Sequence, residues 1–288
     1  MNKKLLSLYG LKWNPFAPEL PVEALRISGQ LESFFWRIEN AHVREGGFAL
    51  ITGEPGTGKS VALRVLAERL GRLRDVTVGA LTHPQSTLAD FYREMGDVFG
   101  VPLKPHNRWV GFKALRERWC AHLESTLLRP VLLIDEAQEM TPAVLSELRL
   151  LSSTHFDSRT ILSVVLTGDG RLTQMLRHED LLQLGSRIRM RLVMDYASRE
   201  ELLGTLRHLL DTAGAPKLMT AELMNTLCDH AAGNYRILTT MAAELLAAAA
   251  QRESDQLDEK LYLEVFAPPR PAAAPSAPPR PLSQQRRR

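Results

Sequence analysis

Residues 53–60 read Gly53-Glu54-Pro55-Gly56-Thr57-Gly58-Lys59-Ser60, which is the spacing G-x-x-x-x-G-K-S. The residues before them, 48–52, form a short apolar run with the length of a buried parallel strand. The residues after them place apolar side chains at helical spacing as far as Gly71. Because this motif requires a strand, a glycine loop and a helix in that order, the sequence predicts the phosphate-binding loop of an α/β fold.

The residue types of this loop suit a polyphosphate. Glycines let the backbone N–H groups turn inward toward anionic oxygens, and the helix that starts near Lys59 adds the positive end of its dipole. Lys59 is predicted to contact the β- and γ-phosphates, and the Ser60 hydroxyl to ligate Mg²⁺. A chance match in a glycine-rich turn is the alternative. The predicted nucleotide-binding residues are Gly53, Glu54, Pro55, Gly56, Thr57, Gly58, Lys59, Ser60 and Val61.

Four apolar residues at positions 131–134 are followed by two carboxylates, Asp135 and Glu136. The run predicts a central buried strand whose end lies at the carboxyl edge, where α/β sheets bind ligands. Asp135 is placed there to hold Mg²⁺ through water. Glu136 is placed to orient or deprotonate the water that attacks the γ-phosphate. The two carboxylates therefore predict a hydrolase rather than a passive nucleotide switch.

The next buried strand is predicted over residues 159–169, and its polar end holds Thr167 and Asp169. A polar side chain at this place is a candidate sensor of the γ-phosphate. Either residue is explained equally well as the start of a turn, so both remain open as sensor candidates.

Arginines supply the remaining candidate site residues. Arg187, Arg189 and Arg191 alternate with apolar residues, which predicts a strand over 187–194 with one charged face. Three such arginines usually form a solvated edge. In a ring-forming ATPase, however, an arginine here reaches the γ-phosphate of a neighbouring subunit and stabilises charge in the transition state. Arg236, at the start of a later helix, is placed to swing onto bound nucleotide.

The chain divides by pattern into four parts. A capping box at residues 198–201 opens an all-helical region, with helices expected at about 198–213, 220–231, 234–251 and 257–265. Phe16, ahead of the loop, is equally well explained by an adenine pocket or by core packing. We therefore expect an N-terminal segment near the adenine site (1–45), a P-loop core (46–195), a helical lid (196–266) and a disordered Pro/Ala/Arg tail (267–288).

Charge and composition limit the functional classes. The tail carries five arginines and no acid, which leaves 31 basic and 33 acidic residues in the rest of a chain whose formal charge is +3. The net charge of the chain outside the tail is thus about −2, and only the tail is suited to contact phosphates or acidic surfaces. Cys120 and Cys228 lack partners at metal-ligand spacing and read as buried thiols. No window has the length and apolar character of a membrane span, so we expect a soluble, cytoplasmic protein.

Taken together, these motifs resemble those of AAA+ ATPases over nearly all of residues 5–266. More narrowly, they are similar to the family typified by the general secretion pathway ATPase ExeA. The shared elements are Gly-Leu-x-x-x-Pro-Phe (Gly10 to Phe16), Gly-Glu-x-Gly-x-Gly-Lys (Gly53 to Lys59), Asp-Glu-Ala-Gln (Asp135 to Gln138), Arg-Ile (Arg187-Ile188) and Gly-x-x-Arg (Gly233 to Arg236).

This resemblance implies an ATPase that uses ATP and Mg²⁺ and oligomerises with ATP. It implies catalytic roles for Lys59, Asp135 and Glu136, with Arg187 as the arginine finger and Arg236 as the second sensor. Two positions depart from the family pattern: Tyr235 stands where proline is frequent, and Asp169 follows Gly168 where glutamine is usual.

The resemblance leaves two partners open. Secretion members of the family continue into a membrane helix and a peptidoglycan-binding module, and this sequence has neither. Transposition ATPases share the core and stop after the helical lid, which favours an assembly on double-stranded DNA that serves a transposase. The alternative is a soluble ExeA-like secretion or assembly ATPase that acts on a protein partner without DNA. A helicase is disfavoured, because such motors need a second motor domain and only a helical pattern follows residue 195.

Overall fold

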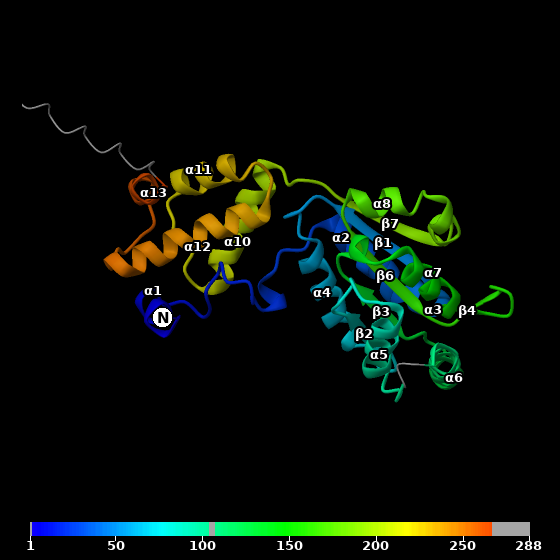
Figure 1. Cartoon of the computed structure of the whole chain (residues 1–288). Coiled ribbons are helices and arrows are strands. Elements are labelled where there is room, and N and C mark those ends of the chain that lie inside the picture. Colours follow the sequence, from blue (N-terminus) through cyan, green and yellow to red (C-terminus); the bar gives the residue numbers. More distant parts are fainter. Residues whose placement is uncertain (1, 104–106, 267–288) are drawn as a thin grey trace, which may run out of the picture.

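The computed structural model describes residues 2–103 and 107–266. The chain forms a five-stranded sheet in the order β2-β3-β6-β1-β7, and every neighbouring pair of strands is parallel. Helices cover both faces, and a separate helical lobe follows (Figure 1). The predicted α/β P-loop fold with a parallel central sheet is confirmed. The strands are β1 Gly47–Gly53, β2 Val78–Leu81, β3 Val131–Ile134, β6 Ser163–Gly168 and β7 Ile188–Met194.

The two faces of the sheet pack into two apolar clusters, because successive strand residues point to opposite sides. Ala49 and Leu133 belong to the cluster that α2–α4 cover, whereas Phe48 and Leu132 belong to the cluster that α5–α9 cover. β3 and β6 are buried on both faces, as their unbroken apolar runs predict. The covering helices are α2 Gly29–Arg37, α3 Val43–Glu45, α4 Lys59–Gly71, α5 Leu88–Phe99, α6 Arg108–Thr126, α7 Pro142–Leu151, α8 Gly170–Met175 and α9 Leu182–Gly185.

The strand expected over residues 159–169 is divided in the structure. Ser163 lies opposite both Gly47 and Val131, so the sheet begins there. The residues before it extend past the neighbouring strands, and β5 (Arg159–Thr160) pairs instead with β4 (Ser153–Thr154) in a short antiparallel hairpin. The turn of this hairpin uses three consecutive non-glycine residues at positive φ, which are His155, Phe156 and Asp157. The helical turns of α8 and α9 also follow no signal that we identified in the sequence.

The helical lobe contains α10 Arg199–Ala213, α11 Ala221–Ala231, α12 Tyr235–Arg252 and α13 Glu259–Phe266, close to the expected ranges. The capping box is present: Ser198 Oγ accepts from Glu201 N at 3.2 Å, and the Glu201 carboxylate accepts from Ser198 N at 2.8 Å. The predicted tail, 267–288, lies outside the described residues. Within the described ranges, no helix combines the length and apolar character that a membrane crossing requires.

The N-terminal segment divides between the two lobes. Helix α1 (Asn2–Tyr9) lies beside the helical lobe (Figure 1), and the Tyr9 hydroxyl donates to Ser254 O at 2.9 Å. Phe16 is buried in the same apolar cluster as α10–α13, so core packing accounts for it. α2 and α3, in contrast, pack on the sheet.

His42 is a buried imidazole at the amino end of the sheet. It ends the π-helical turn η2 (Ile38–His42), is 3% exposed, and has Nε2 3.4 Å from Val164 O. Burial, with a smaller contribution from nearby Arg189 and Arg129, lowers the pKa of His42 to about 4. The folded chain therefore keeps this ring neutral at pH values where an exposed histidine is charged.

This lowered pKa predicts a loss of stability in acid. The unfolded chain binds a proton at His42 below about pH 6.5, whereas the folded chain binds it only near pH 4. Stability must then fall as the pH drops through this window. Between pH 7 and pH 5 we expect His42 to remove about 2 kcal/mol from the free energy of unfolding. Urea denaturation of wild type and His42→Gln at both pH values measures the difference, and equal pH slopes would contradict the prediction.

Candidate functional site

The glycine loop joins the end of β1 to the start of α4. Gly58, at φ 99°, precedes the helix, and Gly56 also has positive φ. Lys59 is only 5% exposed, and its Nζ donates to the carbonyls of Gly53 (2.8 Å) and Glu54 (3.1 Å). A lysine ammonium has three N–H bonds, so one remains for a phosphate oxygen. Ser60 is exposed at the first turn of α4.

Two of the loop glycines stand where atoms from other segments leave no room for a Cβ atom. A Cβ on Gly53 would lie 2.3 Å from Met194 O at the end of β7. A Cβ on Gly56, whose φ is 85°, would lie 2.1 Å from Asn234 Oδ1 of the helical lobe. Only glycine fits either place, and the second contact shows that the lobe rests directly against the loop.

The two carboxylates after β3 lie at the same sheet edge as the loop. The register pairs Ile134 with Leu166, which brings the next residue of β6, Thr167, beside Asp135. The Thr167 side chain is fully buried and its hydroxyl donates to the Asp135 carboxylate. Asp135 also accepts from the backbone N–H of Glu136 at 3.0 Å. Of the two sensor candidates, Thr167 is thus the one that touches the metal-binding candidate Asp135.

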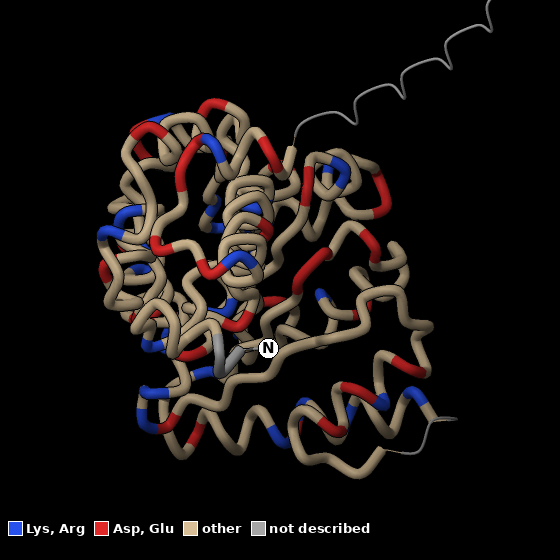
Figure 2. The backbone as a smooth tube through the Cα atoms, turned by 90° about the vertical axis from the view of Figure 1, so that its left-hand side faces the viewer, with Lys and Arg blue, Asp and Glu red and all other residues tan. Residues whose placement is uncertain are grey.

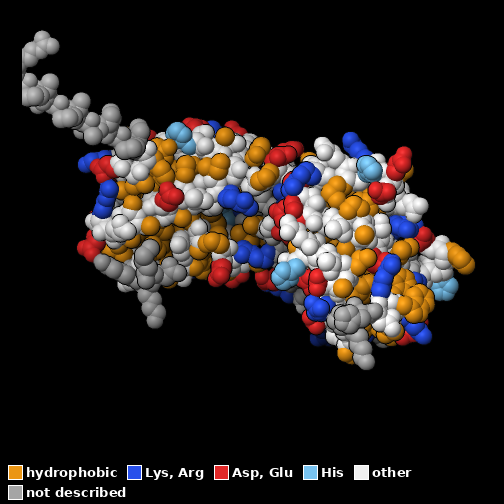
Figure 3. Space-filling model, in the orientation of Figure 1, with side chains coloured by type: hydrophobic (Ala, Val, Ile, Leu, Met, Phe, Trp, Pro, Cys, Tyr) orange, Lys and Arg blue, Asp and Glu red, His pale blue; other side chains and the backbone are white. Residues whose placement is uncertain are grey.

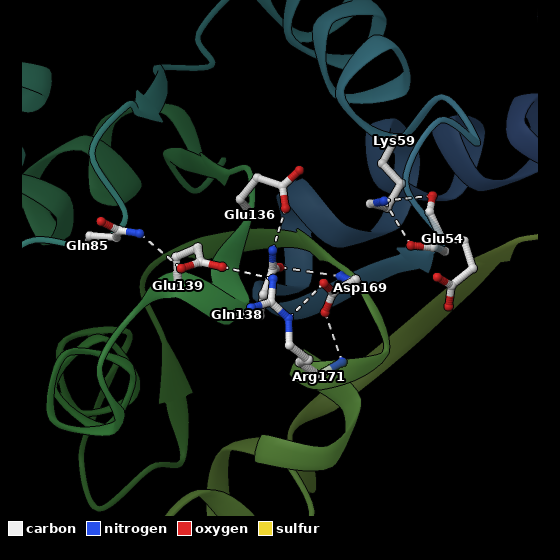
Figure 4. A network of polar contacts seen from close by, with 9 residues as sticks. Glu54, Lys59, Gln85, Glu136, Gln138, Glu139, Asp169 and Arg171 are labelled. Atoms are coloured by element: carbon white, nitrogen blue, oxygen red, sulfur yellow. Dashed lines mark hydrogen bonds and ion pairs between the residues drawn. The ribbon is translucent and has the colours of Figure 1, made fainter. Parts of the chain in front are cut away.

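Glu136 and Asp169 meet through a residue that the sequence interpretation gave no role. Gln138 Nε2 donates to the Glu136 carboxylate, and Gln138 Oε1 accepts from Asp169 N at 3.3 Å (Figure 4). The Asp169 carboxylate caps α8 and accepts from the N and Nε of Arg171 at 2.8 and 2.9 Å. Asp169 therefore acts on the site through its backbone, while its side chain faces Arg171.

The helical lobe contacts the phosphate loop through the start of α12. Asn234 Nδ2 donates to Pro55 O at 3.1 Å, and Tyr235 N donates to Gly56 O at 3.0 Å. Asn234 Oδ1 meanwhile accepts from Arg236 N and Ile237 N, which caps the helix. Burial raises the pKa of the Tyr235 phenol, so this ring stays neutral at physiological pH.

Arg236 is exposed beside this contact, one residue past Tyr235. In the described part of the chain its guanidinium makes no hydrogen bond or ion pair, whereas its backbone N–H donates to Asn234 and its carbonyl accepts from Thr239. The side chain is therefore available to an anionic ligand at the loop.

Arg187 lies away from the phosphate loop. It directly precedes β7, at the amino edge of the sheet, and its guanidinium pairs with Asp157 in the hairpin turn and donates to Gln183 O at 3.3 Å. Arg189 instead pairs with Glu45 at 3.3 Å, and Arg191 donates to Gly185 O at 3.1 Å. The three arginines do not share one strand face as expected, because only Arg189 and Arg191 lie on β7.

The chemistry of the site fits ATP and Mg²⁺. Gly56 and Gly58, both at positive φ, let the loop backbone turn tightly ahead of α4. Ser60 and Asp135 offer hydroxyl and carboxylate oxygens, which Mg²⁺ prefers, and the buried Thr167 bond orients the carboxylate. Lys59 and Arg236 supply the positive charge.

Three contacts of the site were missed by sequence reasoning. Gln138 was visible in the motif Asp135 to Gln138, and Asn234 has the sequence signal of a helix cap. Their hydrogen-bond partners, Asp169 and Pro55, are 31 and 179 residues away in the sequence, so no local sequence signal indicates them. The Asp157 partner of Arg187 belongs to the hairpin that the sequence did not reveal.

Comparison with known proteins agrees with this geometry. Residues 42–176 match the family model described as AAA domain. The chain is 33% identical over 216 residues to general secretion pathway protein A of Aeromonas hydrophila, a match that covers 74% of this chain and 39% of that protein. The chain thus spans well under half the length of this relative.

Solved structures share the fold at low sequence identity. Cdc6p from Pyrobaculum aerophilum has a TM-score of 0.69 at 18% identity, over 87% of this chain and 70% of that one. A chain from the structure of Drosophila ORC bound to DNA has a TM-score of 0.67 at 16% identity, over 92% of this chain and 65% of that one. The sheet order and the matched AAA domain show an AAA-type P-loop fold, and the chain is similar in sequence to general secretion pathway protein A.

Proposed function

We propose that the chain hydrolyses ATP as an oligomer in which Arg187 of one copy completes the site of the next. The position of Arg187 carries this proposal. β7 pairs with β1 in parallel, with Ile188 opposite Phe48, while the phosphate loop begins at Gly53. Five strand residues separate the two levels by roughly 17 Å, beyond the reach of an arginine side chain. Arg187 thus cannot serve its own nucleotide, and a neighbouring copy offers the phosphate it would contact.

The other residues take the following parts in this proposal. Lys59 holds the phosphates by charge, and Arg236 links them to the helical lobe. Asp135, oriented by Thr167, and Ser60 would hold Mg²⁺, which neutralises charge on the phosphate oxygens when bound. Glu136 orients the attacking water and accepts its proton, so the proton moves from water to the Glu136 carboxylate.

Arg187→Ala is expected to lose ATP hydrolysis while ATP binding stays intact. An arginine finger contributes about 10³-fold or more to turnover, because its charge stabilises the transition state rather than the bound ground state. The measurement is kcat at saturating ATP beside the Kd for ATP. Arg189→Ala is the matched control, since Arg189 is also at this edge but is exposed and paired with Glu45. If Arg189→Ala alone were inactive, the finger would be reassigned.

We further propose that the oligomer forms on double-stranded DNA and serves a transposase. The layout of core, lid and arginine-bearing tail supports this reading, as does the fold shared with an ORC chain whose structure contains DNA. Basic and acidic residues are interspersed along the described chain and over the face in view (Figures 2 and 3). We therefore expect the DNA contacts to be few in each copy and to add up on assembly.

The test is the ATPase rate with and without duplex DNA, with size-exclusion elution recorded in ATP and in ADP. Stimulation by DNA together with an ATP-dependent shift to larger species supports the DNA proposal. The experiment is run at low salt, where phosphate contacts are strongest, so absence of DNA binding there would refute it.

A protein partner is the second candidate function. The 33% identity to general secretion pathway protein A favours it directly. In that case ATP drives assembly and turnover in the same way, but DNA changes neither. Recovery of the chain with secretion proteins in a membrane fraction, independent of DNA, would support this alternative.

A further inference from the structure

Gln138 lies in the short helical turn η3 (Ala137–Glu139) and is 8% exposed. Its amide is engaged at both ends, by the Glu136 carboxylate and by the Asp169 backbone N–H. Partner chemistry fixes which way the amide points. The Asp169 N–H only donates and so requires the amide oxygen, which leaves the NH₂ group for the carboxylate, an acceptor.

Packing holds this amide in place. A Cβ on Gly168 would lie 2.6 Å from Gln138 Oε1, so the side chain lies flush against the end of β6. Arg171 then ties the two segments together: it donates to Asp169 and, through Nη2, to Glu139 Oε1 at 2.9 Å. Gln85, from the segment after β2, donates to the other oxygen of Glu139 at 2.9 Å. Figure 4 shows the whole chain of contacts from Gln85 to Glu136.

We propose that Gln138 is a positioning residue for ATP hydrolysis, whose amide N–H holds the Glu136 carboxylate in one orientation. This inference rests on the proposed hydrolysis and deepens it. Glu136 has a flexible side chain on a backbone with φ 50°, and no other described side chain donates to its carboxylate. A base held in one geometry avoids the loss of rate that follows from small misplacements.

Gln138→Leu is the decisive variant, because it removes the donor to Glu136 in a side chain of similar size. We expect it to lower kcat about 10-fold or more while the Kd for ATP is unchanged. Gln138→Glu is the second variant, because it keeps the acceptor for Asp169 N–H and replaces only the donor by a carboxylate. It should lower kcat in the same way, since the contact with Asp169 alone does not orient Glu136.

A merely structural Gln138 would give a different result. Gln138→Glu, which keeps the contact with Asp169 N–H, would then retain wild-type kcat, and Gln138→Leu would lower kcat and ATP affinity together. Either pattern overturns the proposal.

A second measurement tests the contact without hydrolysis. The free energies of unfolding of wild type, Gln138→Leu, Glu136→Ala and the double variant form a double-mutant cycle. If the Gln138 amide contacts the Glu136 side chain, the double variant should lose less stability than the sum of the two single variants. If wild type hydrolyses no ATP, the proposed function fails, yet this cycle still decides whether residue 138 acts on Glu136. Additive effects of the two substitutions would overturn the inference.

Discussion

Lys59→Ala is expected to abolish detectable ATP binding. Lys59 is the buried cation of the phosphate loop, and it already bonds two carbonyls of that loop. Removal of the ammonium takes away the charge that meets the β- and γ-phosphates. It also takes the ammonium donor from the carbonyls of Gly53 and Glu54, although Glu54 O keeps the Thr57 hydroxyl at 2.8 Å. A hydrogen bond to a charged group contributes about 1.5–3 kcal/mol, so the loss of the phosphate contact together with the charge of the ammonium weakens binding by about 100-fold or more.

Calorimetric titration with ATP measures this loss. Lys59→Met serves as a second variant, because it keeps an unbranched apolar stem in the buried site while removing the charge. Lys113→Ala is the matched control, since Lys113 is exposed on α6 and pairs with Glu117 at 3.7 Å. Thermal melting confirms that each variant folds. Normal ATP affinity in a folded Lys59→Met variant would refute the phosphate-loop assignment.

Glu136→Gln is expected to keep ATP binding and stall hydrolysis. Glutamine preserves the shape of the side chain and can still accept from Gln138, but it cannot take a proton from water. General base catalysis contributes about 10²–10⁴-fold, and kcat should fall by that factor while the Kd for ATP changes little. Because ATP then persists, the assembled state should accumulate.

Size-exclusion chromatography in ATP, run beside a single-turnover assay, tests this prediction. The variant should elute as the larger species for longer than wild type after a single addition of ATP. Wild-type turnover would remove Glu136 from the mechanism. Turnover lost together with ATP affinity would mean that Glu136 organises the binding site instead.

Local sequence was sufficient to predict the phosphate loop, β3 with its two carboxylates, and the capped helices of the helical lobe. Each of these depends on residues within a few positions of one another. The choice between Thr167 and Asp169 depends instead on register. Both residues end the same strand, and only the pairing of Ile134 with Leu166 brings Thr167 to Asp135.

Long-range contacts also explain what the sequence left out. The hairpin of β4 and β5 forms because residues 159–160 extend beyond the sheet, which depends on where the neighbouring strands begin. The contact of Asn234 with Pro55 joins segments that are 179 residues apart. Helix capping predicts that Asn234 starts α12, but nothing in that signal indicates what else its amide touches.

The division of the N-terminal segment between the two lobes has a mechanical consequence. The chain crosses from lobe to lobe twice, once over residues 21–28 and again at 195–198, so two covalent connections join the lobes. A lobe held by two connections can rotate about the line through both, but its motion in other directions is restricted. The residues just before the first connection are also bound to α4, where Arg64 donates to Pro18 O and Leu20 O at 3.1 and 2.9 Å. Any rotation of the helical lobe must therefore apply torque to the helix that begins at Lys59.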